Sequence, residues 1–299
     1  MMNKEDFIIY RDFASEISTD AGHLLFDFFG KQLKTEYKDK NNTDPVSEAD
    51  IASQRFLTDR IKKRFPGHGI LGEETLENDK KEDIENDEPD YLWVLDPLDG
   101  TKNFLNGLSI WGCSVGLLYK GEPIAGAIFL PEATGKKDFV IYKASLGSGA
   151  FLGSQQISVT TEKIPSRKKT ISLPGSYFNQ FKTLAPLKNT LGEIRTTGSI
   201  SYDLAMVSRG SLHYALFGVP SIWDIAAGVV IVKEAGGIAL QQKSIFRKWE
   251  PLKKFTRMDG NSSNKEDLRK WKSSIVVGNT SISEYVTSSI RKISRKRKL

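Results

Sequence analysis

The segment that most limits what this chain can fold into is residues 93–104, WVLDPLDGTKNF. Three apolar residues open it and predict a buried strand, which we expect to end at Asp96 because Pro97 follows. Asp96 and Asp99 are three residues apart across a proline-containing turn, which can bring both carboxylates toward one point. The segment therefore predicts two acidic side chains at the rim of a sheet.

The residues around these aspartates add further polar groups. The backbone carbonyl of Leu98 is a third oxygen nearby, and clustered hard oxygens suit Mg²⁺ better than they suit soft metals. The amides of Gly100 and Thr101 can point at an anion if a helix or turn begins there. Taken singly, Asp-Pro and Asp-Gly are ordinary turn signals, so the prediction of a metal-assisted phosphate site depends on the whole segment.

A second segment, residues 223–237, reads WDIAAGVVIVKEAGG. Asp224 precedes an apolar run that fits a buried helix, and Gly236 is placed to end that helix. The alternative interpretation of Asp224, favoured when the segment is taken alone, is an N-capping aspartate on a core helix.

Two shorter segments also carry carboxylates. Residues 70–75, ILGEET, end a short strand with Glu73 and Glu74, which can equally be a solvated strand end. In residues 44–50, DPVSEAD, a turn leads into a helix start at which Ser47 can cap and Asp50 can complete a capping box. Each of these segments alone is weak evidence for a site.

Taken together in this order, the four segments resemble the inositol monophosphatase-like family of magnesium-dependent, lithium-sensitive phosphatases. The GEE, DPxDGTxNF and WDxAAG signatures of that family stand at residues 72–74, 96–104 and 223–228. The resemblance covers most of the chain. It implies an α/β fold, a layered α-β-α-β-α sandwich of the inositol monophosphatase and fructose-1,6-bisphosphatase type, and usually a homodimer.

The resemblance also implies the metal ligands. Glu73, Asp96 and the Leu98 carbonyl would hold one Mg²⁺, and Asp96, Asp99 and Asp224 would hold another, with Asp96 bridging. Two ions about 3.5–4 Å apart can clamp the attacking and leaving oxygens of an in-line displacement. A third, loosely bound ion would act near Glu73.

The catalytic roles come from the same resemblance. Water on the first metal would be the nucleophile, oriented by Thr101, which Asp50 would hold and which would accept the proton. Glu73 would assist, and the second metal would stabilise the leaving alkoxide. Phosphoryl transfer asks the protein mainly for position and charge. We expect His23, His68 and His213 to be structural or exposed.

The substrate side is less clearly marked. Residues 195–200, RTTGSI, resemble the polyol-contacting stretch of the family. Where inositol-specific members have a glutamate, this chain has Phe217, whose ring cannot accept hydrogen bonds from ring hydroxyls. Relatives that act on nucleotide bisphosphates or histidinol phosphate often have lysine at the position of Lys102. The candidate substrate contacts are Gly100, Thr101, Gly198, Ser199, Ile200, Phe217 and Asp224.

Three functions follow from these residues. The first is a magnesium-dependent phosphomonoesterase acting on a small phosphorylated polyol or sugar. The second is the same chemistry on a 3'(2'),5'-bisphosphate nucleotide or on histidinol phosphate. The third belongs to another class: a regulatory protein of this fold that binds RNA or a transcription complex.

Apolar periodicity predicts the architecture. Residues 7–28 and 51–65 show helical spacing, and these two helices should cover one face of a sheet. Residues 113–119 and 123–130 flank a turn and predict a hairpin, followed by a strand at 139–142. We therefore expect an N-terminal α+β half, residues 1–152, with an antiparallel sheet and most metal ligands.

The second half, residues 153–299, has a different pattern and should carry Asp224 and the substrate-side residues. Short strands at 170–173, 212–217 and 275–277 alternate with helices near 199–208, 223–235 and 282–293, which predicts an α/β arrangement. With 299 residues, 39% of them apolar, the chain can bury a substantial core.

Charge and composition bear on location and partners. The net charge is +6, and six basic residues lie within 291–298. We expect this tail to be the solvated end of the last helix; nucleic-acid binding through it is possible but not favoured. The acidic stretch 77–90 predicts an exposed loop. A single cysteine, Cys113, and the absence of a long apolar run favour a cytoplasmic protein without a membrane partner.

Overall fold

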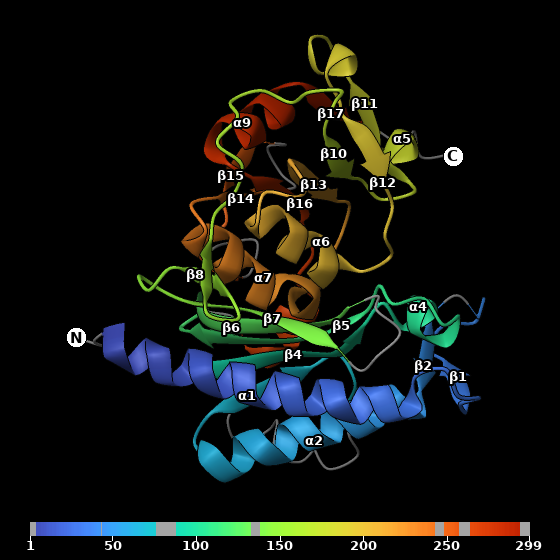
Figure 1. The fold of residues 1–299 in the computed structure, drawn as a ribbon, viewed down its shortest axis with the longest axis vertical. Helices are drawn as coiled ribbons and strands as arrows, with labels where there is room; N and C mark the ends of the chain where they lie inside the picture. The colour runs from blue at the N-terminus through green and yellow to red at the C-terminus, as the bar shows by residue number, and fades with distance from the viewer. Residues whose placement is uncertain are drawn as a thin grey trace.

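The structure is a computed structural model that describes residues 4–42, 44–75, 88–132, 138–242, 248–256 and 264–293. Most of the acidic stretch 77–90, and the basic tail beyond Ile293, lie outside the described residues. The described elements form five layers, with helices below, between and above two sheets (Figure 1). This is the α/β sandwich that the sequence predicts.

The first layer consists of α1 (Lys4–Phe28) and α2 (Glu48–Arg64), both close to their predicted bounds. They cover one face of the first sheet, and the apolar cluster between them includes Ile17, Trp93 and Phe129, all fully buried. The predicted capping box begins α2, because the Ser47 amide and hydroxyl donate to Asp50 Oδ2 at 2.8 and 2.6 Å.

The first sheet has seven strands in the order β3-β4-β5-β6-β7-β8-β9. Strands β3 and β4 are parallel and the remaining pairs are antiparallel, including the predicted β5–β6 hairpin. The strands are β3 (Gly69–Gly72), β4 (Tyr91–Asp99), β5 (Gly112–Tyr119), β6 (Glu122–Pro131), β7 (Phe139–Ser145), β8 (Ala150–Leu152) and β9 (Gln155–Ile157).

Strand β4 is longer than the sequence predicts. We expected it to end at Asp96, but it continues through Pro97 to Asp99. Its pairing with β5 shifts register between Asp96 and Asp99 and resumes where Asp99 faces Gly112. An irregularity of this kind absorbs a residue that has no backbone N–H, so Pro97 interrupts the ladder without ending the strand.

The middle layer consists of α6 (Ile200–Ser208) and α7 (Ile222–Glu234). Glycines in the first sheet let α7 approach closely, since a Cβ on Gly126 would lie 2.7 Å from the Cα of Ala227. Helix α7 is followed by Gly236, whose φ of 85° matches its predicted role in ending the helix.

The second sheet has six strands in the order β12-β10-β13-β16-β14-β15. Strand β10 is parallel to both of its neighbours, and β16 is antiparallel to β13 and β14. The strands are β10 (Thr170–Ser172), β12 (Glu193–Arg195), β13 (Tyr214–Phe217), β14 (Ile238–Gln242), β15 (Trp249–Pro251) and β16 (Ser274–Gly278).

The last layer contains α9 (Thr280–Ser288), and here the prediction of one helix over residues 282–293 is wrong. Ser289 ends the helix, and the chain then forms β17 (Ile290–Lys292), which pairs antiparallel with β11 (Phe181–Thr183). Arg291 and Lys292 therefore belong to a strand, not to a helix end. The pairing with β11 overrides the weak helical pattern of the segment.

Short elements complete the fold. They are β1 (Thr35–Tyr37) and β2 (Pro45–Ser47), which pair as a hairpin, α4 (Thr101–Leu105), α5 (Tyr177–Gln180), a 3₁₀ turn (Leu187–Asn189) and α8 (Lys265–Arg269). Within the described ranges, no helix combines the length and the apolar character that crossing a membrane requires.

Candidate functional site

Four predicted acidic residues approach one another where the first sheet meets the middle layer. Glu73 follows β3, Asp96 and Asp99 flank the irregularity in β4, and Asp224 lies in the first turn of α7. Burial raises the pKa of Asp96 well above its ordinary value, and the negative charges of Glu73, Asp99 and Asp224 raise it further. The fold therefore brings four carboxylates from three elements within electrostatic range.

Asp99 receives hydrogen bonds from the start of α6. Its carboxylate accepts from Ser199 Oγ at 2.6 Å, from the Ser201 amide at 2.7 Å and also from Ser201 Oγ. Burial raises the pKa of Asp99, whereas these donors act to lower it. Ser199 was a predicted substrate contact, but the role of Ser201 was not predicted, because a serine inside a helix gives no motif.

Asp224 also accepts a backbone hydrogen bond at the start of its own helix, α7. Ser221 is the N-cap of α7, and its amide donates to Asp224 Oδ2 at 2.7 Å. The alternative interpretation of Asp224 as the N-cap itself is therefore wrong by three positions, since Asp224 closes a capping box. Burial, followed by the charge of Asp99, raises the pKa of Asp224.

Thr101 lies beside these carboxylates at the start of α4. Its hydroxyl Oγ1 is 3.0 Å from Asp50 Oδ1 and 3.1 Å from the Leu98 carbonyl oxygen, and it can donate to either. The Thr101–Asp50 pair that the resemblance implies is thus formed. Gly100 precedes it with a φ of 84°, and a Cβ there would lie 2.8 Å from the Ile110 carbonyl oxygen.

Asn103 ties the same motif to the predicted substrate loop. Its Nδ2 donates to the Ile110 carbonyl at 2.7 Å and to the Thr197 carbonyl at 2.8 Å. It also packs against Gly198, whose φ is 79°. One amide side chain therefore fixes the loop of residues 195–200 against α4, although the two segments are far apart in sequence.

Two basic residues near the acidic group were not predicted. Lys38 Nζ is 2.7 Å from Glu73 Oε1 and 2.5 Å from Glu74 Oε1. Arg269 of α8 donates to the Gly72 carbonyl at 3.0 Å and lies over the Trp223 ring, 5.7 Å from its centroid. Both come from parts of the sequence without a recognisable motif, so only the tertiary structure reveals them.

The acidic residues do not form a closed ligand set as they stand. Among the described residues, no three carboxylate, histidine or cysteine side chains are grouped closely enough to hold a metal ion. Their oxygens are partly engaged by the chain, since Lys38 bonds to Glu73 and Ser199 bonds to Asp99. The site has the donor chemistry for a hard cation, but its carboxylates must still move to enclose one.

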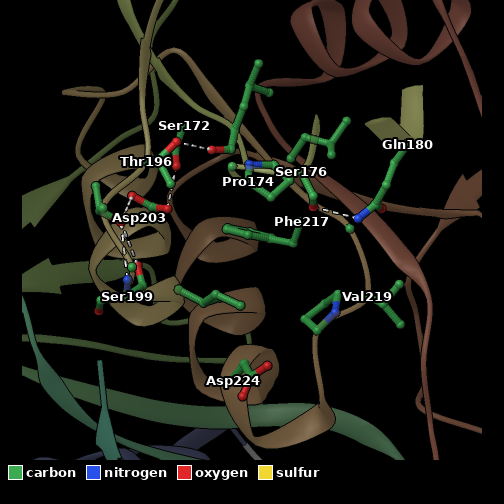
Figure 2. A pocket seen from close by; sticks show the side chains of 18 residues that line it. Ser172, Pro174, Ser176, Gln180, Thr196, Ser199, Asp203, Phe217, Val219 and Asp224 are labelled. Carbon is green, nitrogen blue, oxygen red and sulfur yellow. Dashed lines mark hydrogen bonds between the residues drawn. The ribbon is translucent and has the colours of Figure 1, made fainter. Parts of the chain in front are cut away.

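A cavity of about 520 Å³ opens beside Asp224, between α6, α7 and the ends of β10 and β13 (Figure 2). Five predicted substrate contacts line it: Gly198, Ser199, Ile200, Phe217 and Asp224. Gly100 and Thr101 are not among the lining residues, and Lys102 lies exposed on α4. Thr196 and Thr197, from the predicted stretch 195–200, also line the cavity. The remaining polar side chains of the lining, which the sequence did not indicate, are Ser172, Ser176, Gln180 and Asp203.

The three histidines lie elsewhere. His68 stacks on Tyr91 and accepts a hydrogen bond from Trp93 Nε1 at 3.1 Å. His23 is exposed and lies beside Phe139. His213 is buried near Glu162. None of them lines the described cavity.

Asp203 is a buried acid inside the cavity wall. Its carboxylate accepts from Ser172 Oγ at 2.5 Å and from Thr197 Oγ1 at 2.9 Å. Burial raises its pKa from 3.8 to about 7, against the lowering effect of these two hydroxyls. The folded protein therefore holds a proton on Asp203 to a higher pH than the unfolded chain does.

This linkage predicts a pH-dependent stability. The contribution of Asp203 is fully present below the unfolded pKa and is lost as pH rises through the folded pKa near 7, at up to about 1.4 kcal/mol per unit of pKa shift. Measured without divalent cations, the unfolding free energy should fall from about pH 5 to about pH 8. In Asp203→Asn the fall should be shallower, because the amide does not ionise.

Glu193→Gln is the matched control for this measurement, since the Glu193 side chain is 72% exposed. It should follow the wild-type pH profile. An Asp203→Asn profile that runs parallel to that of the wild type would contradict the assignment of a shifted Asp203.

Comparisons with known proteins agree with this geometry. The sequence matches the model of the Inositol monophosphatase family over residues 10–290. It is 34% identical over 240 residues to the fructose-1,6-bisphosphatase/inositol-1-monophosphatase of Aquifex aeolicus, covering 77% of this chain and 84% of that protein. It is 33% identical over 238 residues to the Nus factor SuhB of Pseudomonas aeruginosa, covering 75% of this chain and 82% of that protein.

The fold is also similar to that of a solved structure. The crystal structure of extragenic suppressor protein suhB from Bartonella henselae is similar with a TM-score of 0.70 and 25% identity, over 93% of this chain and 96% of that one. The chain therefore belongs to the inositol monophosphatase family.

Proposed function

We propose that this chain is a magnesium-dependent phosphomonoesterase that hydrolyses the phosphate ester of a small polyol or sugar. The observation that supports this most directly is the gathering of Glu73, Asp96, Asp99 and Asp224 beside a cavity that Asp224 itself lines. A group of repelling acids next to a substrate-sized cavity is costly for stability alone, which favours a functional reason for it.

The donor chemistry fits a hard divalent cation. We propose that Glu73, Asp96 and the Leu98 carbonyl form one ligand set, and that Asp96, Asp99 and Asp224 form another. All are oxygen donors, which suit Mg²⁺, and positive charge there would relieve the repulsion that raises the pKa of Asp96. When bound, such ions supply the charge that activates water and stabilises the leaving oxygen.

The chain itself supplies orientation and proton handling. Asp50 accepts a hydrogen bond from Thr101 Oγ1, which leaves the lone pairs of that oxygen free to accept a hydrogen bond from a water molecule. If Thr101 takes up the proton of that water, its own hydroxyl proton would pass to Asp50. We propose that Thr101 positions the attacking water in this way, with Glu73 assisting. We propose that the amides of Gly100 and Thr101, at the start of α4, contact the phosphate.

The cavity wall favours a neutral alcohol over one that carries a second phosphate. Among its lining residues in the described part of the chain there is no lysine, arginine or histidine. A second phosphate needs cationic or multiple amide donors when it leaves water. The polar hydroxyls and amide at Ser172, Ser176 and Gln180 instead suit an uncharged polyol or sugar. We therefore rank bisphosphate nucleotides below monophosphate esters as substrates.

Further parts of the proposal depend on family membership. They are a homodimer and sensitivity to lithium. A cytoplasmic location and a division into halves near residue 152 are proposed from the composition and pattern of the sequence instead. The name Nus factor belongs to two of the relatives, those of Pseudomonas aeruginosa and Xylella fastidiosa, and describes those proteins. Four of the six basic residues of the tail, those at 295–298, lie outside the described residues. The gathered carboxylates and the cavity beside them support catalysis, so we propose catalysis as the function.

The first test of the proposal is Asp96→Asn. Because Asp96 would bridge both ligand sets, its loss should reduce Mg²⁺-dependent phosphate release at least a hundredfold, about 2.7 kcal/mol of barrier. Removing the buried charge also removes repulsion, so the variant should fold at least as stably as the wild type. Phosphate release and circular dichroism measure the two effects.

Asp90→Asn is the control, since the Asp90 side chain precedes the same strand and is 61% exposed. It should keep wild-type turnover. If Asp96→Asn retains near wild-type turnover while folding normally, the proposed ligand assignment is wrong.

The second test concerns Phe217 and the alcohol. Phe217 lines the cavity and cannot accept hydrogen bonds from ring hydroxyls, so myo-inositol 1-phosphate should be a poorer substrate than at least one other monophosphate ester. Phe217→Glu should shift kcat/KM toward inositol phosphate by about ten- to a hundredfold, the value of one charged hydrogen bond.

Val219→Glu provides the matched control. Val219 lines the same cavity but is 52% exposed, so a carboxylate there stays in water. That variant should leave the substrate ranking unchanged. A wild type that already prefers inositol phosphate above the whole panel, with a ranking that Phe217→Glu does not alter, would contradict the assignment of the pocket.

A further inference from the structure

Lys38 is a cation that the chain itself places in the acidic site. It directly follows β1, and its amide donates to the Asp44 carbonyl at 2.9 Å, which closes the β1–β2 hairpin. Strand β2 leads straight into the capping box of α2 and hence to Asp50. The hairpin is thus joined in sequence to Asp50 through β2, and it contacts Glu73 through the Lys38 side chain.

The Lys38 ammonium contacts two neighbouring carboxylates. It lies 2.7 Å from Glu73 Oε1 and 2.5 Å from Glu74 Oε1. The side chains are 28% exposed for Lys38, 21% for Glu73 and 7% for Glu74. The Lys38–Glu73 contact is a charge-assisted hydrogen bond and the Lys38–Glu74 contact is an ion pair, and their partly buried surroundings make them stronger than ordinary surface ion pairs.

Strand β1 is mostly exposed, whereas Pro45 and Ser47 of β2 are buried. Thr35 is partly exposed, and Glu36 and Tyr37 are exposed, with Tyr37 at 49%. At its base, the Lys34 amide donates to Glu48 Oε1 at 3.1 Å, and the Glu48 amide donates to the Lys34 carbonyl at 3.2 Å. Little apolar burial ties strand β1 down, so the ion pairs of Lys38 carry a large share of the attachment of this side of the hairpin.

A divalent cation and the Lys38 ammonium would compete for the same carboxylate, that of Glu73. Glu73 is a proposed ligand of the first Mg²⁺, and its Oε1 is the atom that accepts from Lys38. Two cations on one carboxylate repel each other strongly at this distance and burial. One of them must leave, or Glu73 must turn from one to the other.

We propose that Lys38 is a built-in counter-ion for Glu73 and Glu74 that a divalent cation must displace, so that the β1–β2 hairpin is released from Glu73 when the metal site fills. This inference rests on the proposed function, because it takes Glu73 as a metal ligand. Displaced from Glu73, the ammonium can keep Glu74 as its partner. Lys38 is a positioning residue: it acts on metal affinity and on the hairpin rather than on the reacting atoms.

Replacing Lys38 with a neutral residue changes the Mg²⁺ affinity in opposite directions depending on whether Lys38 competes with the metal for Glu73 or helps to orient Glu73 as a ligand. If Lys38 competes, its neutral replacement leaves Glu73 and Glu74 uncompensated in the metal-free protein and removes the displacement cost. The metal-free protein then melts at a lower temperature, and Mg²⁺ binds more tightly. If Lys38 instead merely orients Glu73, the same replacement weakens Mg²⁺ binding.

The test is titration calorimetry of the metal-free, full-length protein with MgCl₂, without substrate. Lys38→Met keeps the length of the side chain but not its charge, and should lower the Kd for Mg²⁺ about three- to tenfold, the range that such ion pairs contribute. Its melting temperature in a chelator should fall below that of the wild type, and the difference should shrink in saturating MgCl₂. Lys40→Met removes a charge from an exposed position of the same hairpin, and should change neither quantity.

Lys38→Arg serves as a second variant in case Lys38→Met does not fold. It keeps the charge and should bind Mg²⁺ with a Kd close to that of the wild type. A Kd for Lys38→Met that equals or exceeds the Kd of Lys40→Met overturns the inference while leaving the proposed function in place. If the wild type itself does not bind Mg²⁺, the proposed function fails and the inference fails with it.

Discussion

Mutual repulsion among four carboxylates is the constraint around which the rest of the site is arranged. Asp96 is 2% exposed, and its pKa is raised because burial and the charges of Glu73, Asp99 and Asp224 all oppose its ionisation. Like charges in a partly dry site persist only where something offsets them. The chain offsets part of the repulsion with hydroxyls, amides and the ammonium groups of Lys38 and Lys272, and we propose that divalent cations offset the rest.

The compensation comes from elements that are far apart in sequence. The start of α6 donates from Ser199 and Ser201 to Asp99, and the capping box of α7 ties Asp224 to the amide of Ser221. On the other side, Lys38 bonds to Glu73. The bonds of Ser199 and Ser201 to Asp99 also hold α6 against the first sheet, and the bond of Lys38 to Glu73 joins the β1–β2 hairpin to the end of β3.

Much of this arrangement could be predicted from the sequence. Motif residues lie in single segments with strong local signals: the capping box at Ser47, the turn at Gly100 and the apolar run of α7 all formed as expected. What escaped prediction depends on tertiary contact. Ser201, Lys38 and Arg269 have no motif, and the final helix gave way to β17 because β11 offers a strand partner. Strand β4 continues beyond Pro97 because the β4–β5 pairing shifts register there, which accommodates a residue that has no backbone N–H.

The most direct test of the central claim is to locate the cation. In crystals grown with MnCl₂, an ion with the same oxygen preference as Mg²⁺, anomalous scattering reveals the metal position independently of activity. The account predicts anomalous peaks among Glu73, Asp96, Asp99 and Asp224, with oxygens drawn in around them and the Lys38 ammonium away from Glu73. Peaks confined to other surfaces, with these four carboxylates unoccupied at saturating MnCl₂, would contradict it.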